Sequence, residues 1–418
     1  MSLTGNILPK NQTRRPAAKA LRAASAVLLS GMLGLTACSR DYTVAYLYAT
    51  ASGNNAAGVI NEYGIAYQSG ALVPIGGSPV AAGNNPISIV ATSNGLFLYV
   101  LNQGDSTVQE FAAGTDGKLT SKNTYKTGTH PTAQALDATG KFLYVTYTYQ
   151  SGFSATNPGP GGINVFPVNA DNSLGTPSSV NVGNNPVGIA ATNFNNYVYV
   201  IDAEPAIGSA SPFGVLLAFS QNATSGALTP IGSTKITVDT SGKTVATGYG
   251  AGTIPSAIAV DPRARFVYVT DRATNQLYGN LIIAGGLLQP MQNSPFATGL
   301  LPVAVTVDPR GMYLYVSNFN ANTVSAYVIS QSTGAAVGAV GSNATAVGTG
   351  PTCVAIEPAL GIYMYSSNNL DNTTTGMQLD PHNGTLKATQ NSPYPASGTP
   401  TCVVAVANGA HATQVVQP

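Results

Sequence analysis

The feature that most constrains this chain is a proline followed thirteen or fourteen residues later by a tyrosine, repeated along its length. Between them lie an apolar run, a turn and an aromatic or β-branched run, as from Pro302 to Tyr315. This order predicts a strand, a tight turn and a second strand. A Thr-Val pair such as Thr323-Val324, and then a Gly-led turn such as Gly384-Thr385-Leu386, predict a third and a fourth strand. The prolines are Pro86, Pro131, Pro186, Pro255, Pro302, Pro351 and Pro400.

Four strands in units of about 45 to 50 residues, without helical periods, are typical of propeller blades. The chain ends predict how the ring closes. Tyr48 stands at a second-strand position with no Pro-led strand before it, and Pro400 opens a first strand with no second strand after it. We therefore expect an all-β, seven-bladed β-propeller in which residues 400–406 complete the blade built from residues 43–80. Closure removes the unpaired strand edges of an open array.

The residue two positions after each proline is small, as expected where seven strands converge on a narrow axis. These residues are Ser88, Ala133, Gly188, Ala257, Ala304, Cys353 and Cys402. Cys353 and Cys402 stand in matching Pro-Thr-Cys-Val contexts of neighbouring inner strands. Export to an oxidising compartment would permit a disulfide between them, whereas parallel side chains on equivalent strands favour two buried thiols. Both interpretations remain open.

The first 37 residues predict an export signal. They contain five basic residues and no acidic residue, and residues 23–35 form a 13-residue apolar core that is too short to span a bilayer. Leu35-Thr36-Ala37-Cys38 resembles a bacterial lipobox, which implies cleavage before Cys38 and acylation of its thiol. Ser39 at the next position implies an outer-membrane lipoprotein. The predicted organisation is a signal peptide (1–37), a lipidated linker (38–42), the propeller (43–410) and a tail (411–418).

Charge is scarce, since Asp, Glu, Lys and Arg make up 8% of the chain while hydrophobic residues make up 44%. That hydrophobic content argues against a disordered chain. Without residues 1–37 the chain carries 12 basic and 16 acidic residues. A surface that neutralises phosphates is therefore not expected, and we predict no nucleic-acid partner.

The run Leu314-Tyr315-Val316-Ser317-Asn318, and Leu98-Tyr99-Val100-Leu101-Asn102 before it, resemble the Tyr-Val-x-Asn repeats of the YVTN and lactonase-like propellers. That superfamily includes the 6-phosphogluconolactonase-like proteins. The resemblance covers residues 41 to about 410. It implies the seven-bladed fold, and it allows hydrolysis of a sugar lactone as an activity.

Antiparallel blades place the loops before first strands and after second strands at one end of the ring, here called the upper face. The large insertions at residues 148–161, 203–213 and 239–254 all belong to these loops, so we expect a ligand there. Polar residues near the ends of the second strands are candidate ligand contacts, although Asn and Asp at such positions also bond their own hairpin backbone. The candidates are Asn102, Tyr147, Asp202, Glu204, Asn318 and Asn368.

For lactone hydrolysis the candidates are His130 as general base, Asp271, and Arg272 to hold an anionic group. The alternative for His130 is a turn residue that caps backbone carbonyls. We favour a lipid-anchored propeller that acts as a binding or scaffolding module, with lactone hydrolysis as the second hypothesis. We predict no cofactor and no metal site, a membrane contact through the N-terminal lipid only, and a protein or carbohydrate ligand on the upper face.

Overall fold

A computed structural model describes residues 42–53, 57–204, 213–238, 244–338 and 344–409. The predicted signal peptide, Cys38 and tail residues 411–418 lie outside these residues. The described part is built of strands and one short 3₁₀ helix (Ala284–Gly286), and it contains no helix that could span a membrane. The expectation of an all-β chain is confirmed.

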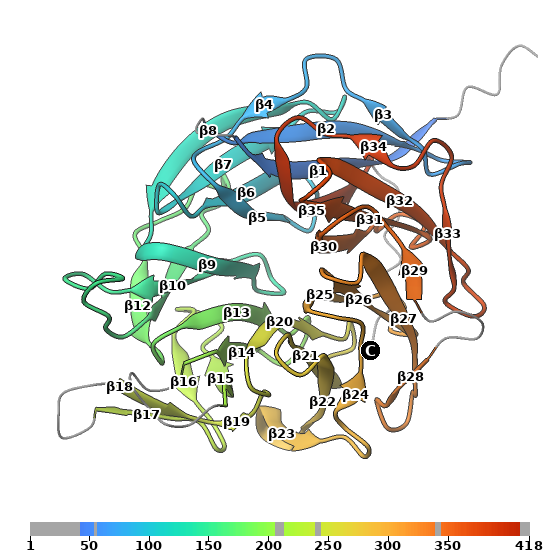
Figure 1. Cartoon of the computed structure of the whole chain (residues 1–418). Coiled ribbons are helices and arrows are strands. Elements are labelled where there is room, and N and C mark those ends of the chain that lie inside the picture. The colour runs from blue at the N-terminus through green and yellow to red at the C-terminus, as the bar shows by residue number, and fades with distance from the viewer. Residues whose placement is uncertain (1–41, 54–56, 205–212, 239–243, 339–343, 410–418) are drawn as a thin grey trace, which may run out of the picture. The chain divides into compact units, whose positions relative to one another are not determined.

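Seven antiparallel sheets surround a common axis (Figure 1). Blade 1 contains β5 (Pro86–Ala91), β6 (Phe97–Asn102), β7 (Thr107–Ala113) and β8 (Leu119–Lys126), and blade 2 contains β9 (Thr129–Leu136), β10 (Phe142–Tyr149), β11 (Gly162–Pro167) and β12 (Ser178–Asn181). Blade 3 contains β13 (Pro186–Ala191), β14 (Tyr197–Asp202), β15 (Val215–Gln221), β16 (Leu228–Pro230) and β19 (Tyr249–Gly250). Blade 4 contains β20 (Pro255–Val260), β21 (Phe266–Asp271), β22 (Gln276–Ile283), β23 (Leu287–Pro290) and β24 (Phe296–Ala297).

The remaining blades follow the same order. Blade 5 contains β25 (Pro302–Val307), β26 (Tyr313–Asn318), β27 (Thr323–Ile329), β28 (Ala336–Gly338) and β29 (Ala344–Ala346). Blade 6 contains β30 (Pro351–Ile356), β31 (Tyr363–Asn368), β32 (Thr373–Leu379), β33 (Leu386–Ala388) and β34 (Tyr394–Pro395). Blade 7 contains β35 (Thr399–Ala407), β1 (Thr43–Ser52), β2 (Val59–Ala66), β3 (Leu72–Pro74) and β4 (Val80–Ala81).

The ring closes as the chain ends predict. The C-terminal strand β35 pairs with β1, which places Val406 opposite Tyr46 and Val403 opposite Ala49. Because β1 runs from Thr43 at the lower face to Ser52 at the upper face, the chain enters the propeller from below. The upper loops therefore lie at the other end of the ring from the point of entry.

The repeated tyrosine links each blade to the next. Tyr315 is fully buried, and its hydroxyl donates a 3.0 Å hydrogen bond to the carbonyl oxygen of Gly384, in the third-to-fourth strand turn of blade 6. The aromatic residue two positions earlier, Tyr313, covers the same glycine, since a Cβ on Gly384 would lie 2.3 Å from the Tyr313 ring. Equivalent hydroxyl bonds join all seven pairs of neighbouring blades: Tyr48 to Gly117, Tyr99 to Asn172, Tyr144 to Gly226, Tyr199 to Gly286, Tyr268 to Gly334, Tyr315 to Gly384 and Tyr365 to Gly70.

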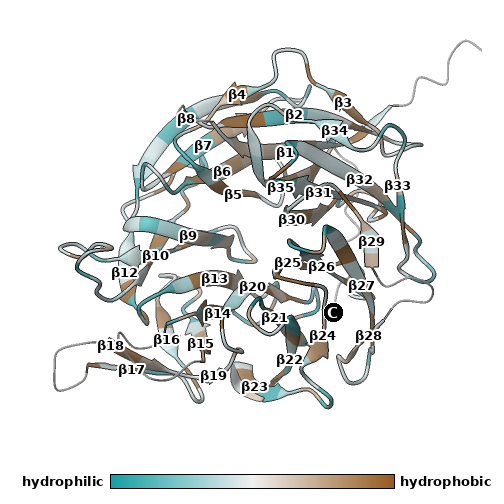
Figure 2. Ribbon diagram, viewed as in Figure 1, coloured by the Kyte–Doolittle hydropathy of each residue, from teal (hydrophilic) through white to brown (hydrophobic). Residues whose placement is uncertain are grey.

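Hydrophobic clusters fill the spaces between neighbouring blades. One cluster joins Tyr46 and Tyr48 of blade 7 to Leu98, Val100 and Phe111 of blade 1. Figure 2 shows that the outer strand β8, by contrast, is largely hydrophilic. An additional hairpin of β17 (Lys235–Val238) and β18 (Thr244–Thr247) projects beside blade 3 (Figure 1). Of the expected insertion at residues 239–254, β18 is one strand of this ribbon, and its partner β17 precedes the insertion.

Candidate functional site

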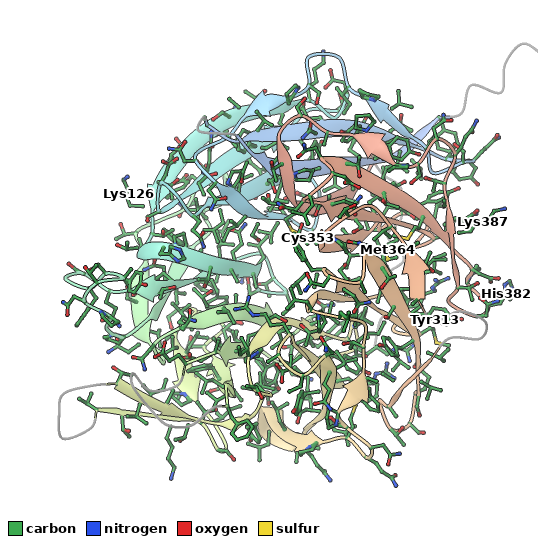
Figure 3. All side chains as sticks on the ribbon, in the orientation of Figure 1. Lys126, Tyr313, Cys353, Met364, His382 and Lys387 are labelled. Carbon is green, nitrogen blue, oxygen red and sulfur yellow. A yellow bond between two sulfur atoms is a disulfide. The ribbon has the colours of Figure 1, made fainter. Side chains whose placement is uncertain are left out.

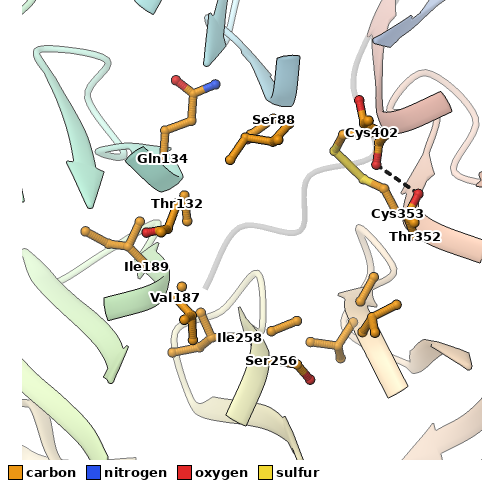
Figure 4. Close-up of a pocket in the computed structure, with 18 of the residues that line it drawn as sticks. Ser88, Thr132, Gln134, Val187, Ile189, Ser256, Ile258, Thr352, Cys353 and Cys402 are labelled. Atoms are coloured by element: carbon orange, nitrogen blue, oxygen red, sulfur yellow. Dashed lines mark hydrogen bonds between the residues drawn. A yellow bond between two sulfur atoms is a disulfide. The ribbon is translucent and has the colours of Figure 1, made fainter. Parts of the chain in front are cut away.

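A cavity of about 250 Å³ lies on the ring axis among the inner strands of all seven blades (Figure 4). Each inner strand carries a β-bulge just after its proline, because the pairing with the second strand shifts by one residue there. The small residues predicted for this position line the cavity: Ser88, Ala133, Gly188, Ala257, Ala304, Cys353 and Cys402. The expectation of a narrow axis is confirmed.

Hydroxyl groups at the bulge link neighbouring inner strands. Ser256 Oγ donates a 2.7 Å hydrogen bond to the carbonyl oxygen of Pro302 in the next blade, and Thr352 Oγ1 donates to the carbonyl oxygen of Thr401 at 2.9 Å. The cavity lining carries hydroxyl, amide and aliphatic groups and a disulfide. No acid or base is among its lining residues, all of which belong to the described part of the chain.

Cys353 and Cys402 form that disulfide, with their Cα atoms 4.8 Å apart (Figures 3 and 4). Of the two interpretations left open by the sequence, the structure contains the bonded one. The convergence of the inner strands near the axis brings equivalent positions of blades 6 and 7 close enough for a covalent link. The disulfide therefore joins the closing strand β35 to the inner strand of its neighbour.

Five of the six predicted ligand contacts are buried, namely Asn102, Tyr147, Asp202, Asn318 and Asn368. Asn318 Oδ1 accepts a 3.0 Å hydrogen bond from the Gly299 N–H, and its Nδ2 donates to Ser325 Oγ at 2.9 Å. Asp202 Oδ1 likewise accepts a 3.0 Å hydrogen bond from the Asn185 N–H. In these two residues the contacts match the alternative role, in which the side chain holds the upper loop of its own blade. Glu204 is the exposed member of the group.

Asp271 and Asp202 occupy the same position in neighbouring blades and differ in their electrostatics. Burial acts to raise the pKa of Asp271, but hydrogen bonds from Ile254, Thr253, Thr274 and Ala273 hold it below its ordinary value. Burial raises the pKa of Asp202 to about 7, and the negative charge of Glu204 adds to this effect, while backbone hydrogen bonds from Glu204 and Asn185 oppose it. Asp271 is thus a buried, ionised anchor for the loop before Pro255.

The three candidate catalytic residues lie on two blades. His130 is the second residue of β9, the inner strand of blade 2, whereas Asp271 ends β21, the second strand of blade 4, and Arg272 follows it. The His130 side chain is exposed, and its Nδ1 atom lies 3.4 Å from Thr148 Oγ1. Within the described residues, no hydrogen bond or ion pair joins His130 to Asp271 or Arg272. The structure therefore does not assemble these groups into a contacting set.

Exposed apolar side chains form a feature of the upper face that the sequence analysis missed. We call Ile254, Leu300, Phe319 and Leu370, on blades 4 to 6, the apolar arc. The exposed fraction is 38% for Ile254, 58% for Leu300 and 61% for Leu370. Leu370 and Phe319 meet over Gly350, where a Cβ would lie 2.7 Å and 3.1 Å from their carbon atoms. In the sequence, the adjacent leucines Leu300 and Leu301 before Pro302 were the feature that could have indicated this apolar surface.

The backbone supports this pair in an unusual conformation. Leu301 has φ = 55°, a left-handed value that is rare for a bulky residue. The loop is held by hydrogen bonds from Phe319 N–H to the Leu301 carbonyl oxygen at 2.9 Å and from Asn320 N–H to the Leu300 carbonyl oxygen at 3.2 Å. The residue before the inner-strand proline is also left-handed at Asn85 (φ = 48°) and His130 (φ = 59°), so this conformation belongs to the repeated upper loop.

The fold agrees with a family model described as "Lactonase, 7-bladed beta-propeller", which matches residues 45–181 and 235–356, more than half of the chain. The chain belongs to this family. No curated protein matches this lactonase propeller in sequence.

Several solved structures resemble the lactonase propeller closely in fold. A proposed 6-phosphogluconolactonase from Bacteroides fragilis is 19% identical with a TM-score of 0.67, covering 88% of this chain and 99% of that one. A second, from Bacteroides uniformis, is 18% identical with a TM-score of 0.68, covering 88% of this chain and 100% of that one. The Pseudomonas aeruginosa periplasmic gluconolactonase PpgL is 19% identical with a TM-score of 0.67, covering 87% of this chain and 99% of that one. At these identities the likeness concerns the fold.

Proposed function

We propose that this lactonase propeller is a lipid-anchored protein of the cell envelope that binds a protein partner through the apolar arc. The observation that carries the proposal is the solvent exposure of Leu300 and Leu370 beside Phe319 on one face of a rigid ring. Contiguous exposed apolar surface is characteristic of protein interaction sites. The lipid on Cys38 is part of the proposal and follows from the lipobox resemblance.

The charges on the upper face support binding more than catalysis. The Asp271 carboxylate already accepts hydrogen bonds from the N–H groups of Thr253 and Ile254 in the loop that it anchors. The residues that line the axial cavity include neither an acid nor a base. The groups proposed for catalysis would have to act from separate blades. A binding surface needs no such convergence, because its affinity comes from buried area and shape.

The experiment compares Leu300→Asp and Leu370→Asp with the control Val337→Asp, which alters an equally exposed apolar residue on β28, away from the arc. Each protein would carry a photo-cross-linker in place of Asn320 and would be mixed with solubilised cell envelope. Cross-linked proteins would be identified by mass spectrometry. Each identified protein would then be purified and tested for direct binding. The proposal predicts a partner whose purified form binds wild type and Val337→Asp but not the arc variants. Absence of any such partner, or equal binding by all variants, would contradict it.

Lactone hydrolysis is the second candidate, favoured by membership of the lactonase family and by the names of the similar structures. It would use His130 as the base, because the imidazole is exposed on the upper face. Measuring lactone opening by wild type and by His130→Ala tests this candidate directly.

A further inference from the structure

A second cavity, of about 380 Å³, lies at the upper, outer corner of blade 1. It shares no lining residue with the axial cavity, and in Figure 3 Lys126 lies at the outer edge of the ring while Cys353 lies near the axis. Its lining is mostly polar and combines donors, acceptors and two charged groups: Ala82, Gly83, Asn102, Asp105, Thr107, Gln109, Thr124 and Lys126.

The floor of this pocket contains an unused hydrogen-bond acceptor. Asn102 is 1% exposed, and its Nδ2 donates to Thr107 Oγ1 at 3.3 Å, but its Oδ1 atom has no partner. The corresponding oxygen of Asn318 in blade 5 accepts a hydrogen bond from the N–H of Gly299. A buried acceptor without a partner is costly, so a donor brought by a ligand would be favourable there.

Asp105 accounts for the difference between the two blades. Its Oδ2 accepts a 2.6 Å hydrogen bond from the Asn84 N–H, and its Oδ1 accepts a 2.7 Å bond from Asn84 Nδ2. The upper loop of blade 1 is therefore held by Asp105, while in blade 5 the loop is held by Asn318. This exchange leaves the buried Asn102 Oδ1 atom without a hydrogen-bond partner.

The walls add a second acceptor and a cation. Gln109 Nε2 donates to Ser121 Oγ at 3.1 Å, which leaves the Gln109 amide oxygen for a ligand. Lys126 is exposed and forms no ion pair with any described residue, whereas Lys118 on the same blade pairs with Asp116 at 3.6 Å. The pocket thus offers oxygen acceptors below and an unpaired ammonium group at the rim.

We propose that this pocket binds a uronic acid residue of a polysaccharide. Sugar hydroxyls donate hydrogen bonds to the Asn102 and Gln109 amide oxygens, and the sugar carboxylate accepts a charge-assisted bond from Lys126. A single pyranose fits within the cavity volume of about 380 Å³. The site lies outside the apolar arc, so it extends the proposed function and does not depend on it.

The test is isothermal titration of the mature, folded protein with glucuronate and with glucose, supported by saturation-transfer NMR. The variants are Lys126→Ala and Gln109→Ala, and the matched control is Lys122→Ala, which removes an exposed lysine of the same strand outside the pocket lining. We expect saturable glucuronate binding that is stronger than glucose binding. Lys126→Ala should weaken glucuronate binding about tenfold, a loss of about 1.4 kcal/mol in binding free energy. It should also abolish the preference for glucuronate over glucose.

Gln109→Ala should weaken the binding of both sugars, and Lys122→Ala should leave the affinity for each sugar unchanged. The proposal is overturned if neither sugar saturates, if glucose binds as tightly as glucuronate, or if the two lysine variants behave alike. Partner capture by Leu300→Asp and Val337→Asp is measured separately, so failure of the sugar site and failure of the proposed function give different results.

Discussion

The hydroxyl of Tyr315 in blade 5 donates a 3.0 Å hydrogen bond to the carbonyl oxygen of Gly384 in blade 6, in a space sealed from solvent. Removing the hydroxyl with Tyr315→Phe leaves that carbonyl oxygen buried without this donor. We expect the free energy of unfolding to fall by about 1 to 2 kcal/mol. Urea unfolding followed by circular dichroism measures the change.

The matched control is Tyr149→Phe, since the hydroxyl of Tyr149 takes part in no hydrogen bond described in the structure and its ring is only partly buried. Its stability should match that of wild type within about 0.5 kcal/mol. Equal losses from the two substitutions would show that the interblade hydrogen bond contributes nothing specific.

The disulfide between Cys353 and Cys402 constrains the unfolded chain and ties β35 to blade 6. Replacing both cysteines with serine should lower the free energy of unfolding by about 2 to 4 kcal/mol. Reductant should lower the stability of wild type to the level of the double variant and leave the variant unchanged. Two free thiols per chain in oxidised, denatured wild type would refute the bond.

Asp202 makes stability depend on pH in a defined direction. Burial raises its folded-state pKa to about 7 from an ordinary value of 3.8, so the folded protein holds this proton more tightly than the unfolded chain. The stabilisation is fully present below about pH 4 and is lost as the pH rises through 7, at up to about 1.4 kcal/mol per pH unit.

Substituting Asp202→Asn should remove that decline between pH 4 and 7, and chemical denaturation across this range measures it. Asp271→Asn is the opposing control. Hydrogen bonds lower the pKa of Asp271, so its stabilisation is present at neutral pH and is lost on acidification. Parallel pH profiles for wild type and Asp202→Asn would contradict the role given to burial.

Together with the proposed lipid on Cys38, the position of Thr43 predicts which face lies near the membrane. Thr43 is at the lower face and stands five positions after Cys38 in the sequence, a reach of at most about 18 Å. The chain contains no tryptophan, so a single Trp can report depth. In lipidated protein on vesicles, brominated lipid should quench Leu96→Trp at the lower face and spare Leu300→Trp at the upper face. Stronger quenching of Leu300→Trp would reverse the proposed orientation.

The fold could be predicted because its determinants are local and repeated. The proline and tyrosine of each unit fix the first two strands, and the unmatched Tyr48 and Pro400 identify the closing blade. The site was harder to predict. The Asn318 side chain could contact a ligand or the Gly299 N–H, and the choice depends on the path of a loop nineteen residues earlier in the chain. The spacing of residues along the chain does not specify that path.

The apolar arc was missed for a related reason. Leu300 and Leu370 are seventy residues apart and become neighbours of Phe319 only through the ring geometry. An isolated exposed leucine needs no functional explanation, so no single position indicated a surface. The disulfide also depended on a distance, the 4.8 Å between Cα atoms of adjacent inner strands, that the repeat alone could not supply.

We propose that the upper face binds a partner and does not hydrolyse a lactone. The most direct measurement is the rate of opening of gluconolactone and 6-phosphogluconolactone by wild type and by His130→Ala, with the spontaneous rate subtracted. We expect that both proteins leave the spontaneous rate unchanged. A wild-type rate above background that falls in His130→Ala would overturn the binding proposal and establish lactone hydrolysis.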